Sequence, residues 1–339
     1  MFEIKIGTVL MGAHALDPDM LPALEPFGFE GYEVSLDRYC FRTYDIAEYA
    51  KRLNDALCST PLSALGCYAN PLASEDDRRD LIHLMDCAHL FGCNTISVFA
   101  GALPDHTVAE SMPTFKKVFS ELCARAEDKG LKIAMENCSG SSWTSRDNYN
   151  IAYGPDAWEM MFDAVPSEAL GLEWEPSHQR RQLIDPIAQL RRWARRVYHI
   201  HGKDGTIAWD VIREHGVRGR EPWFWDRTPG CGDTNWNDVC TILMQNGYRG
   251  FITIEGYHDP VHYDDGEWSA QMRSLTYLKD CRGGQTFIEG PAYKGFPQPK
   301  DSYAKQAPAR RIHGRSRRSG RRFSYRVLLK ALFTNITSG

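Results

Sequence analysis

Short apolar runs and longer amphipathic stretches alternate along most of this chain. The apolar runs are rich in β-branched and aromatic residues and predict eight strands, at 3–10, 29–36, 62–70, 94–103, 131–138, 170–178, 197–204 and 250–259. Helical spacing predicts helices at 17–28, 43–57, 74–92, 109–130, 155–165, 186–196, 236–247 and 267–280. Ser74 and the acidic residues after it are typical of a helix start, and Gly92 is typical of a helix end.

Eight strands that alternate with helices predict an α/β fold in which the strands close into a parallel (β/α)8 TIM barrel. A doubly wound open sheet shows the same alternation, but no GxGxxG motif follows any of the strands. The dinucleotide-binding form of that alternative is therefore disfavoured. We expect the barrel to occupy residues 1–285 as a single domain.

Chargeable side chains gather at the C-terminal ends of the later strands, which is where TIM barrels carry their active sites. In 197–204, alternate positions place His199, His201 and Lys203 on one face of the strand. Four consecutive strands each deliver a carboxylate or an imidazole toward the same mouth. These residues are Glu136, Glu175, His201 and Glu255.

Three carboxylates and one imidazole would repel one another in a barrel mouth unless a positive charge compensates them. One divalent metal ion would supply that charge. Oxygen-rich ligands with one nitrogen favour Mn²⁺, with Mg²⁺, Co²⁺ or Zn²⁺ as alternatives. The simpler interpretation is four ordinary strand-end residues in separate salt bridges.

Several stretches together resemble the sugar phosphate isomerase/epimerase family of the xylose isomerase-like barrels. That superfamily includes ketose 3-epimerases, inosose dehydratases, 3-oxo-glycoside lyases and metal-dependent repair endonucleases. The resemblance covers residues 3–285. The matching stretches are "IAMENC", "NIAYGPDAWEMMFDAVPSEALGLEWEPSH", "HIHGKD", "PGCGDTNWNDV" and "GYRGFITIEGYHDP".

The resemblance implies that Glu136, Glu175, His201 and Glu255 are the metal ligands. The chain departs from the family at "EPSH", because Glu175 stands where relatives usually have Asp. A second departure is "IEGYHD", where relatives often carry more acidic residues after the strand-eight Glu. The longer Glu175 side chain can still bind a metal ion, but its carboxylate is displaced by about one C–C bond.

The resemblance also implies a mechanism. The metal polarises a sugar carbonyl, one carboxylate removes the neighbouring proton, and a second returns a proton to the enediolate that the metal stabilises. Glu136 and Glu255 would be this catalytic acid/base pair. His178 resembles the family's substrate-binding His, and a helix-capping role is its alternative. Lys203 would contact the substrate or pair with Asp204 or Glu173.

Other positions are weaker candidates. The long loop 205–235 contains Trp223, Phe224 and Trp225, which would stack on a substrate or anchor the loop, and Arg218 or Arg220 would reach substrate oxygens. Near the earlier strands, we expect polar or aromatic side chains to line the mouth. They are His14, Glu33, His106 and Trp143. His199 is expected one layer deeper than His201, as support or packing.

Charge divides the chain into two regions. Residues 301–339 hold ten Lys or Arg and one Asp, a balance of +9. Because the whole chain has a net charge of −4, the remaining residues carry −13. We expect 286–339 to be a basic, low-complexity, disordered extension; a nucleic-acid or membrane-surface role is the alternative.

The scattered cysteines, without a CxxC pair, predict reduced thiols in a cytoplasmic protein. No apolar run is long enough to cross a membrane.

The sequence therefore predicts a metal-dependent sugar isomerase or epimerase that acts on a small sugar or sugar derivative. A lyase that uses the same site for β-elimination, such as a dehydratase or a 3-oxo-glycoside-cleaving enzyme, is the alternative. A non-catalytic barrel subunit is a third possibility. Nucleic acid is not expected as a partner, because the acidic body lacks a basic groove. We expect a homo-oligomer, or a hetero-oligomer if the protein is a lyase.

Overall fold

The computed structural model describes residues 3–11, 15, 17–36, 44–138, 146, 148–263 and 265–283. These residues lie within one compact unit, Met1–Phe287. The expected C-terminal extension, 286–339, lies outside the described residues, as do His14 and Trp143.

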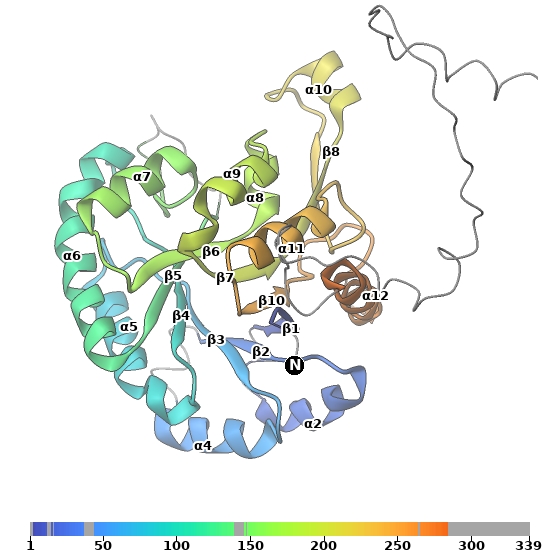
Figure 1. Cartoon of the computed structure of the whole chain (residues 1–339). Helices are drawn as coiled ribbons and strands as arrows, with labels where there is room; N and C mark the ends of the chain where they lie inside the picture. The colour runs from blue at the N-terminus through green and yellow to red at the C-terminus, as the bar shows by residue number, and fades with distance from the viewer. Residues whose placement is uncertain are drawn as a thin grey trace, which may run out of the picture. The chain divides into compact units, whose positions relative to one another are not determined.

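Eight parallel strands close into a barrel in the order β1-β10-β7-β6-β5-β4-β3-β2 (Figure 1). Each corresponds to one of the eight predicted runs, so the predicted TIM barrel is confirmed. Most strands end before their predicted C-terminal limit, because the polar residues there leave the ladder and enter the loops at the barrel mouth. The strands are β1 (Lys5–Leu10), β2 (Tyr32–Ser35), β3 (Leu62–Cys67), β4 (Thr95–Val98), β5 (Lys132–Glu136), β6 (Leu170–Trp174), β7 (Val197–Gly202) and β10 (Phe251–Ile254).

Helices alternate with the barrel strands along the chain and, apart from the short helix inside the long loop 205–235, lie around the barrel (Figure 1). They are α2 (Leu21–Leu24), α4 (Ile46–Ala56), α5 (Glu75–Cys87), α6 (Val108–Lys129), α7 (Pro155–Ala164), α8 (Pro176–Arg181), α9 (Pro186–Trp193), α10 (Trp209–His215), α11 (Trp236–Gln245) and α12 (Asp265–Arg282). The Ser74 side chain accepts a hydrogen bond from the amide of Asp77, and Gly92 has a φ of 62°, as their sequence signals predicted. Of the described helices, none combines the length and the apolar character needed to cross a bilayer.

The first predicted helix, 17–28, is not continuous. It consists of the four-residue α2 between two 3-10 turns. Pro18, Pro22 and Pro26 recur every four residues, and each lacks the amide hydrogen that a continuous helix needs.

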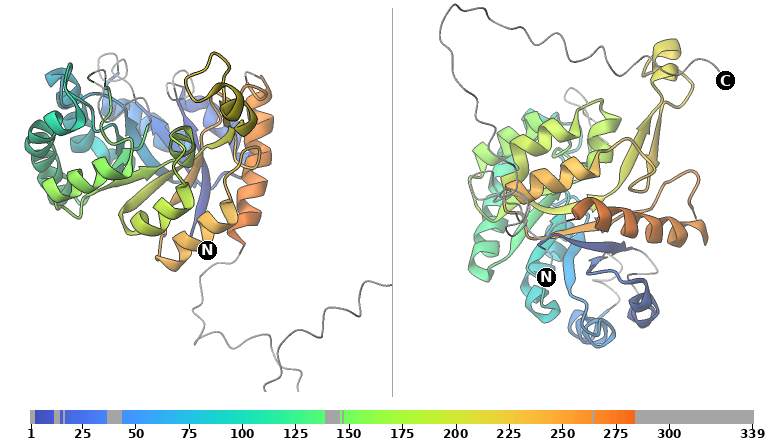
Figure 2. Two further views of the ribbon diagram at one scale, coloured as in Figure 1. Left: turned by 90° about the horizontal axis from the view of Figure 1, so that it is seen from above. Right: turned by 45° about the vertical axis from the view of Figure 1, so that its right-hand side comes forward.

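The sequence did not predict an antiparallel hairpin inside the long loop 205–235. Its strands are β8 (Asp204–Ile207) and β9 (Phe224–Arg227), with α10 between them. Figure 2 shows this arm, in yellow, standing away from the barrel. Asp204 fixes its base, because the carboxylate accepts hydrogen bonds from the amides of Gly205 and Thr234 and from the Trp236 indole.

The core has two parts of opposite character. Between the strands and the surrounding helices, large apolar side chains of the helices are fully buried, for example Phe115, Trp158 and Trp236. Inside the barrel, one layer is polar, whereas branched apolar residues usually fill this space. Buried polar groups need partners, so this layer has to be internally bonded. Its members are Glu33, Tyr68, Ser97, Glu173, His199, His201 and Thr253.

Candidate active site

The four predicted metal ligands converge at the C-terminal mouth of the barrel. Glu136 is the last residue of β5, Glu175 directly follows β6, His201 lies in β7 and Glu255 directly follows β10. All four are buried, and one ligand atom from each lies within 4.8 Å of all the others. Parallel strands therefore bring these side chains to one point, as the sequence predicted.

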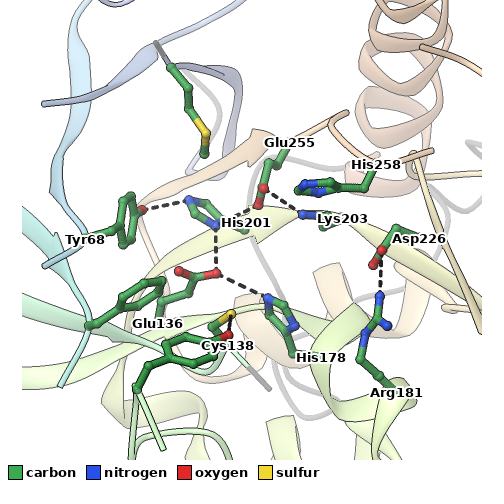
Figure 3. A pocket seen from close by; sticks show the side chains of 13 residues that line it. Tyr68, Glu136, Cys138, His178, Arg181, His201, Lys203, Asp226, Glu255 and His258 are labelled. Carbon is green, nitrogen blue, oxygen red and sulfur yellow. Dashed lines mark hydrogen bonds and ion pairs between the residues drawn. The ribbon is translucent and has the colours of Figure 1, made fainter. Parts of the chain in front are cut away.

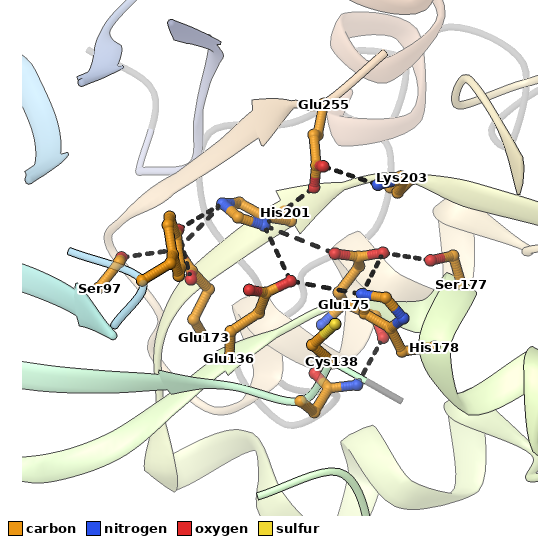
Figure 4. Close-up of polar contacts among 12 residues, drawn as sticks. Ser97, Glu136, Cys138, Glu173, Glu175, Ser177, His178, His201, Lys203 and Glu255 are labelled. Carbon is orange, nitrogen blue, oxygen red and sulfur yellow. Dashed lines mark hydrogen bonds and ion pairs between the residues drawn. The ribbon is translucent and has the colours of Figure 1, made fainter. Parts of the chain in front are cut away.

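Three buried atoms of this quartet make no hydrogen bond: Nδ1 of His201 and the Oε2 atoms of Glu175 and Glu255. Nδ1 lies 3.1 Å from Glu255 Oε2 and 3.5 Å from Glu175 Oε2 (Figure 4). Buried polar atoms are rarely left unsatisfied in folded proteins. Two carboxylate oxygens and an imidazole nitrogen that face one another without hydrogen bonds form a donor set that suits a divalent cation.

Glu175 is held from both its backbone and its side chain. The Asn137 side chain accepts a hydrogen bond from the Glu175 amide at 2.7 Å and donates one to the Glu175 carbonyl at 2.9 Å. Oε1 of Glu175 accepts a hydrogen bond from the Ser177 hydroxyl and lies 3.3 Å from Nε2 of His178. These contacts leave Oε2 as the oxygen that faces His201. The longer side chain at this position is therefore accommodated.

The two carboxylate oxygens of Glu255 also have different partners. Its Oε1 lies 2.6 Å from the Lys203 ammonium, while Oε2 faces His201. Burial alone would lower the pKa of Lys203, but the Glu255 carboxylate, then Glu175, raise it above its usual value. Lys203 therefore stays charged and pairs with Glu255, rather than with Asp204 or Glu173 as the alternative interpretation expected.

His178 lies between two of the predicted ligands. Its Nε2 is 3.3 Å from Glu136 Oε1 and 3.3 Å from Glu175 Oε1. Burial would lower the pKa of His178, but the Glu175 carboxylate above all raises it well above its usual value. The imidazole is thus a hydrogen-bond donor at the mouth, beside the two carboxylates.

A pocket of about 620 Å³ opens above the quartet (Figure 3). One wall is aromatic: the rings of Tyr68 and Phe99 are 5.2 Å apart, and those of Phe99 and Tyr149 are 5.8 Å apart. The opposite side is charged and includes Lys203, His178, Glu255 and an ion pair of 2.6 Å between Arg181 and Asp226. Apolar walls with a few convergent polar groups are typical of small-molecule sites.

Of the predicted substrate contacts, His178 and Lys203 line this pocket, but His106, Arg218 and Trp225 do not. His106 is exposed and contacts the Pro104 carbonyl. Arg218 is exposed near the far end of the arm, and Trp225 pairs with Thr206 within the hairpin. Arg218 lies where the hairpin has carried the loop away from the mouth. Trp225 precedes Asp226, which does line the pocket, and the alternation of side chains along β9 points Trp225 to the opposite face.

Two other expectations concern the same region. Trp223 and Phe224 also belong to the arm, and the Trp223 indole donates to the Val217 carbonyl, which fits a role in anchoring the loop. Glu33 does not line the pocket but is fully buried beneath it. His199 is buried and does not line the pocket, which fits its expected supporting role, and its Nε2 lies 2.9 Å from Glu33.

The sequence analysis missed Asn137, Ser177 and the pair of Arg181 and Asp226. Asn137 follows Glu136 directly, so the polar pair at the end of β5 was its available signal. Ser177 lies inside the "EPSH" motif. Nothing local predicts the Arg181–Asp226 pair, because it joins α8 to a strand of the hairpin that was itself not predicted.

Comparisons with known proteins find relatives over parts of this chain. An inosose dehydratase of Clostridium tetani is 31% identical over 177 residues, which is 50% of this chain and 55% of the relative. One from Clostridium beijerinckii is 28% identical over 167 residues, 47% of this chain and 50% of the relative. This chain thus spans about half the length of the dehydratases named here.

Solved structures share the fold at lower identity. A 3-keto-D-glucoside 4-epimerase from E. coli has a TM-score of 0.61 at 14% identity and covers 82% of this chain and 100% of its own. A D-allulose 3-epimerase from Methylomonas has a TM-score of 0.59 at 17% identity, over 83% and 99% of the two chains. The family model described as "Xylose isomerase-like TIM barrel" matches residues 21–281. The chain therefore belongs to the xylose isomerase-like TIM barrel family.

Proposed function

We propose that this protein is a divalent-metal-dependent isomerase or epimerase of a sugar or sugar derivative. The observation that carries the proposal is the group of three unsatisfied buried atoms, on Glu175, His201 and Glu255, that face one another at the barrel mouth. Together with Glu136, these residues would hold the ion. The oxygen-rich set with one nitrogen favours Mn²⁺ over the softer metals.

A bound divalent cation would polarise a carbonyl group and so make the neighbouring C–H bond more acidic. The protein's own groups would move the proton. Glu255 is suited to accept it, because the Lys203 ammonium, against the effect of burial, lowers the pKa of its carboxyl group and keeps it ionised. The C–H electron pair then forms the C=C bond of an enediolate as the carbonyl π electrons move to oxygen.

Glu136, in its protonated form, would deliver a proton to the opposite face of the same carbon, while Glu255 keeps the proton that it accepted. It projects from β5, whereas Glu255 projects from the end of β10, and His178 Nε2 lies within 3.3 Å of the Glu136 carboxylate. His178 would also donate a hydrogen bond to the reacting oxygen. The aromatic wall formed by Tyr68, Phe99 and Tyr149 would hold the apolar face of the sugar.

The first prediction concerns the two catalytic carboxylates. Glu136→Gln and Glu255→Gln should each lower kcat by at least ~10²-fold, the usual contribution of general acid–base catalysis, while the fold is retained. Turnover would be measured on a panel of keto-sugars and 3-oxo-glycosides with added Mn²⁺. Thermal melting serves as the folding control. Full activity in either variant would contradict the acid/base roles.

A lyase is the second candidate, because two sequence relatives are dehydratases. Both reactions begin with proton removal next to a carbonyl, but a lyase then expels a β-substituent. Turnover in deuterated water separates them. Deuterium incorporation into recovered substrate or its epimer supports the isomerase, and loss of water or of an aglycone supports the lyase.

A further inference from the structure

The polar layer inside the barrel contains two carboxylates that the proposed reaction does not use. Glu33 and Glu173 project from β2 and β6, and neither side chain is exposed. Both contact the same atom, Nε2 of His201, at 3.0 Å and 3.1 Å. This nitrogen is on the side of the ring opposite the ligand cluster.

We propose that Glu33 and Glu173 are positioning residues that fix His201 in one tautomer, with the hydrogen on Nε2 and the lone pair of Nδ1 aimed at the metal ion. The inference rests on the proposed metal site and assigns two residues to it that lie outside the ligand set.

The hydrogen-bond pattern around Nε2 carries this assignment. A carboxylate can only accept hydrogen bonds unless it is protonated, so two carboxylates at Nε2 favour a hydrogen on that nitrogen. A neutral imidazole then has its lone pair on Nδ1, which is the unsatisfied atom that faces Glu175 and Glu255. Hydrogen bonds of this kind to the second nitrogen fix the orientation of metal-binding histidines.

The surrounding contacts keep the two carboxylates in place. The Tyr68 hydroxyl lies 2.7 Å from Glu33 Oε1 and 2.8 Å from Glu173 Oε2, so it bridges them. The Ser97 hydroxyl donates to Glu173 at 2.6 Å, and the Thr253 hydroxyl donates to Glu33 at 3.0 Å. Glu33 thus reaches across the barrel interior to β7, a strand with which β2 does not pair.

The test is the Mn²⁺ dissociation constant of the full chain, measured by titration with detection of free Mn²⁺ by electron paramagnetic resonance. Glu33→Ala should weaken binding by ~10- to 100-fold, the usual effect of losing such a partner. Glu33→Gln should weaken it less, because the amide oxygen still accepts a hydrogen bond from Nε2. Glu173→Gln should behave like Glu33→Gln.

Ser111→Ala is the control. Ser111 is buried in α6 and accepts a hydrogen bond from the Leu103 amide, and it belongs neither to the polar layer nor to the pocket. Its variant should lose thermal stability and keep the wild-type Mn²⁺ affinity. A nitrogen-15 NMR spectrum of the histidine rings in the Mg²⁺-loaded protein should show hydrogen on Nε2 of His201 in the wild type, and a mixture of tautomers in Glu33→Ala.

Two results would overturn the inference. One is wild-type Mn²⁺ affinity in folded Glu33→Ala or Glu173→Gln protein, and the other is an equal loss of affinity in Ser111→Ala. Should the Glu33 variants fail to fold, Tyr68→Phe removes the hydroxyl that bridges the two carboxylates and itself lies 3.2 Å from Nε2 of His201, and it should weaken binding measurably. Absence of Mn²⁺ binding by the wild type would instead contradict the proposed function, so the two failures are distinct.

Discussion

At the scale of single residues, the site depends on how two glutamates divide their oxygens. Oε1 of Glu175 contacts Ser177 and His178, and Oε1 of Glu255 contacts the Lys203 ammonium. Each keeps Oε2 free of hydrogen bonds on the side of His201. The protein contacts therefore leave one oxygen of each carboxylate available to an ion.

This division predicts the effect of shortening the side chain at position 175. Glu175→Asp should weaken Mn²⁺ binding, by tenfold or more as an order of magnitude, because the shorter side chain cannot reach both Ser177 and the cluster. Titration with Mn²⁺ measures the change. Glu159→Asp, on the exposed surface of α7, is the control. Equal or tighter binding by Glu175→Asp would show that the longer side chain is not matched to its surroundings.

The sequence was sufficient to predict which residues form the quartet, but not what holds them. The four residues could be identified because each directly ends a predicted strand or lies in it, and parallel strands end at the same mouth. The contacts of Asn137 with Glu175 and of Glu33 with His201 join residues 38 and 168 positions apart. Such contacts depend on the pleat and stagger of the closed barrel, which no local pattern encodes.

At the scale of elements, sequence signals were reliable where the local chain determines the structure. The Ser74 cap of α5 and the helix end at Gly92 are examples. In α6, the structure also shows a capping box, in which the side chains of Thr107 and Glu110 each bond the backbone of the other. The β8–β9 arm was missed because its strands have four residues each, and neither DGTI nor FWDR alternates apolar and polar residues.

The capping box predicts a pH dependence of stability. Hydrogen bonds from the backbone and side chain of Thr107, then from Arg146, lower the pKa of Glu110 from 4.5 to about 2. A carboxyl whose pKa is lower in the folded state stabilises the fold above the unfolded pKa and loses that effect as the pH falls. The difference in Tm between wild type and Glu110→Ala should therefore be full above pH 4.5 and shrink toward pH 2.

Thermal melting across that pH range checks this prediction. Glu121→Ala removes an exposed carboxyl from the same helix without touching the cap, and its Tm difference should stay small throughout. A Tm difference for Glu110→Ala that does not depend on pH would show that the ionised carboxylate does not stabilise the cap.

At the scale of the whole molecule, the barrel puts an uncommon polar layer beneath its mouth. That layer carries buried carboxylates and imidazoles at a cost in desolvation, which its dense hydrogen bonding offsets. Fold class and strand order followed from the eightfold alternation in the sequence. The polar layer did not, because each of its residues looks like an isolated polar position within an otherwise apolar strand.

The closure of the barrel also predicts which part of the chain is sufficient for the site. Strand β10 pairs with β1, and α12 follows and packs against both. Every residue assigned to the metal site, the pocket and the polar layer lies within Met1–Phe287.

A chain that ends at Phe287 should therefore melt within about 2 °C of the full chain, which is less than ~1 kcal/mol for a domain of this size. Its Mn²⁺ dissociation constant should be unchanged within twofold, by the same titration. A clear loss of either property would show that residues after 287 contribute to the fold or to the site, although the barrel is closed without them.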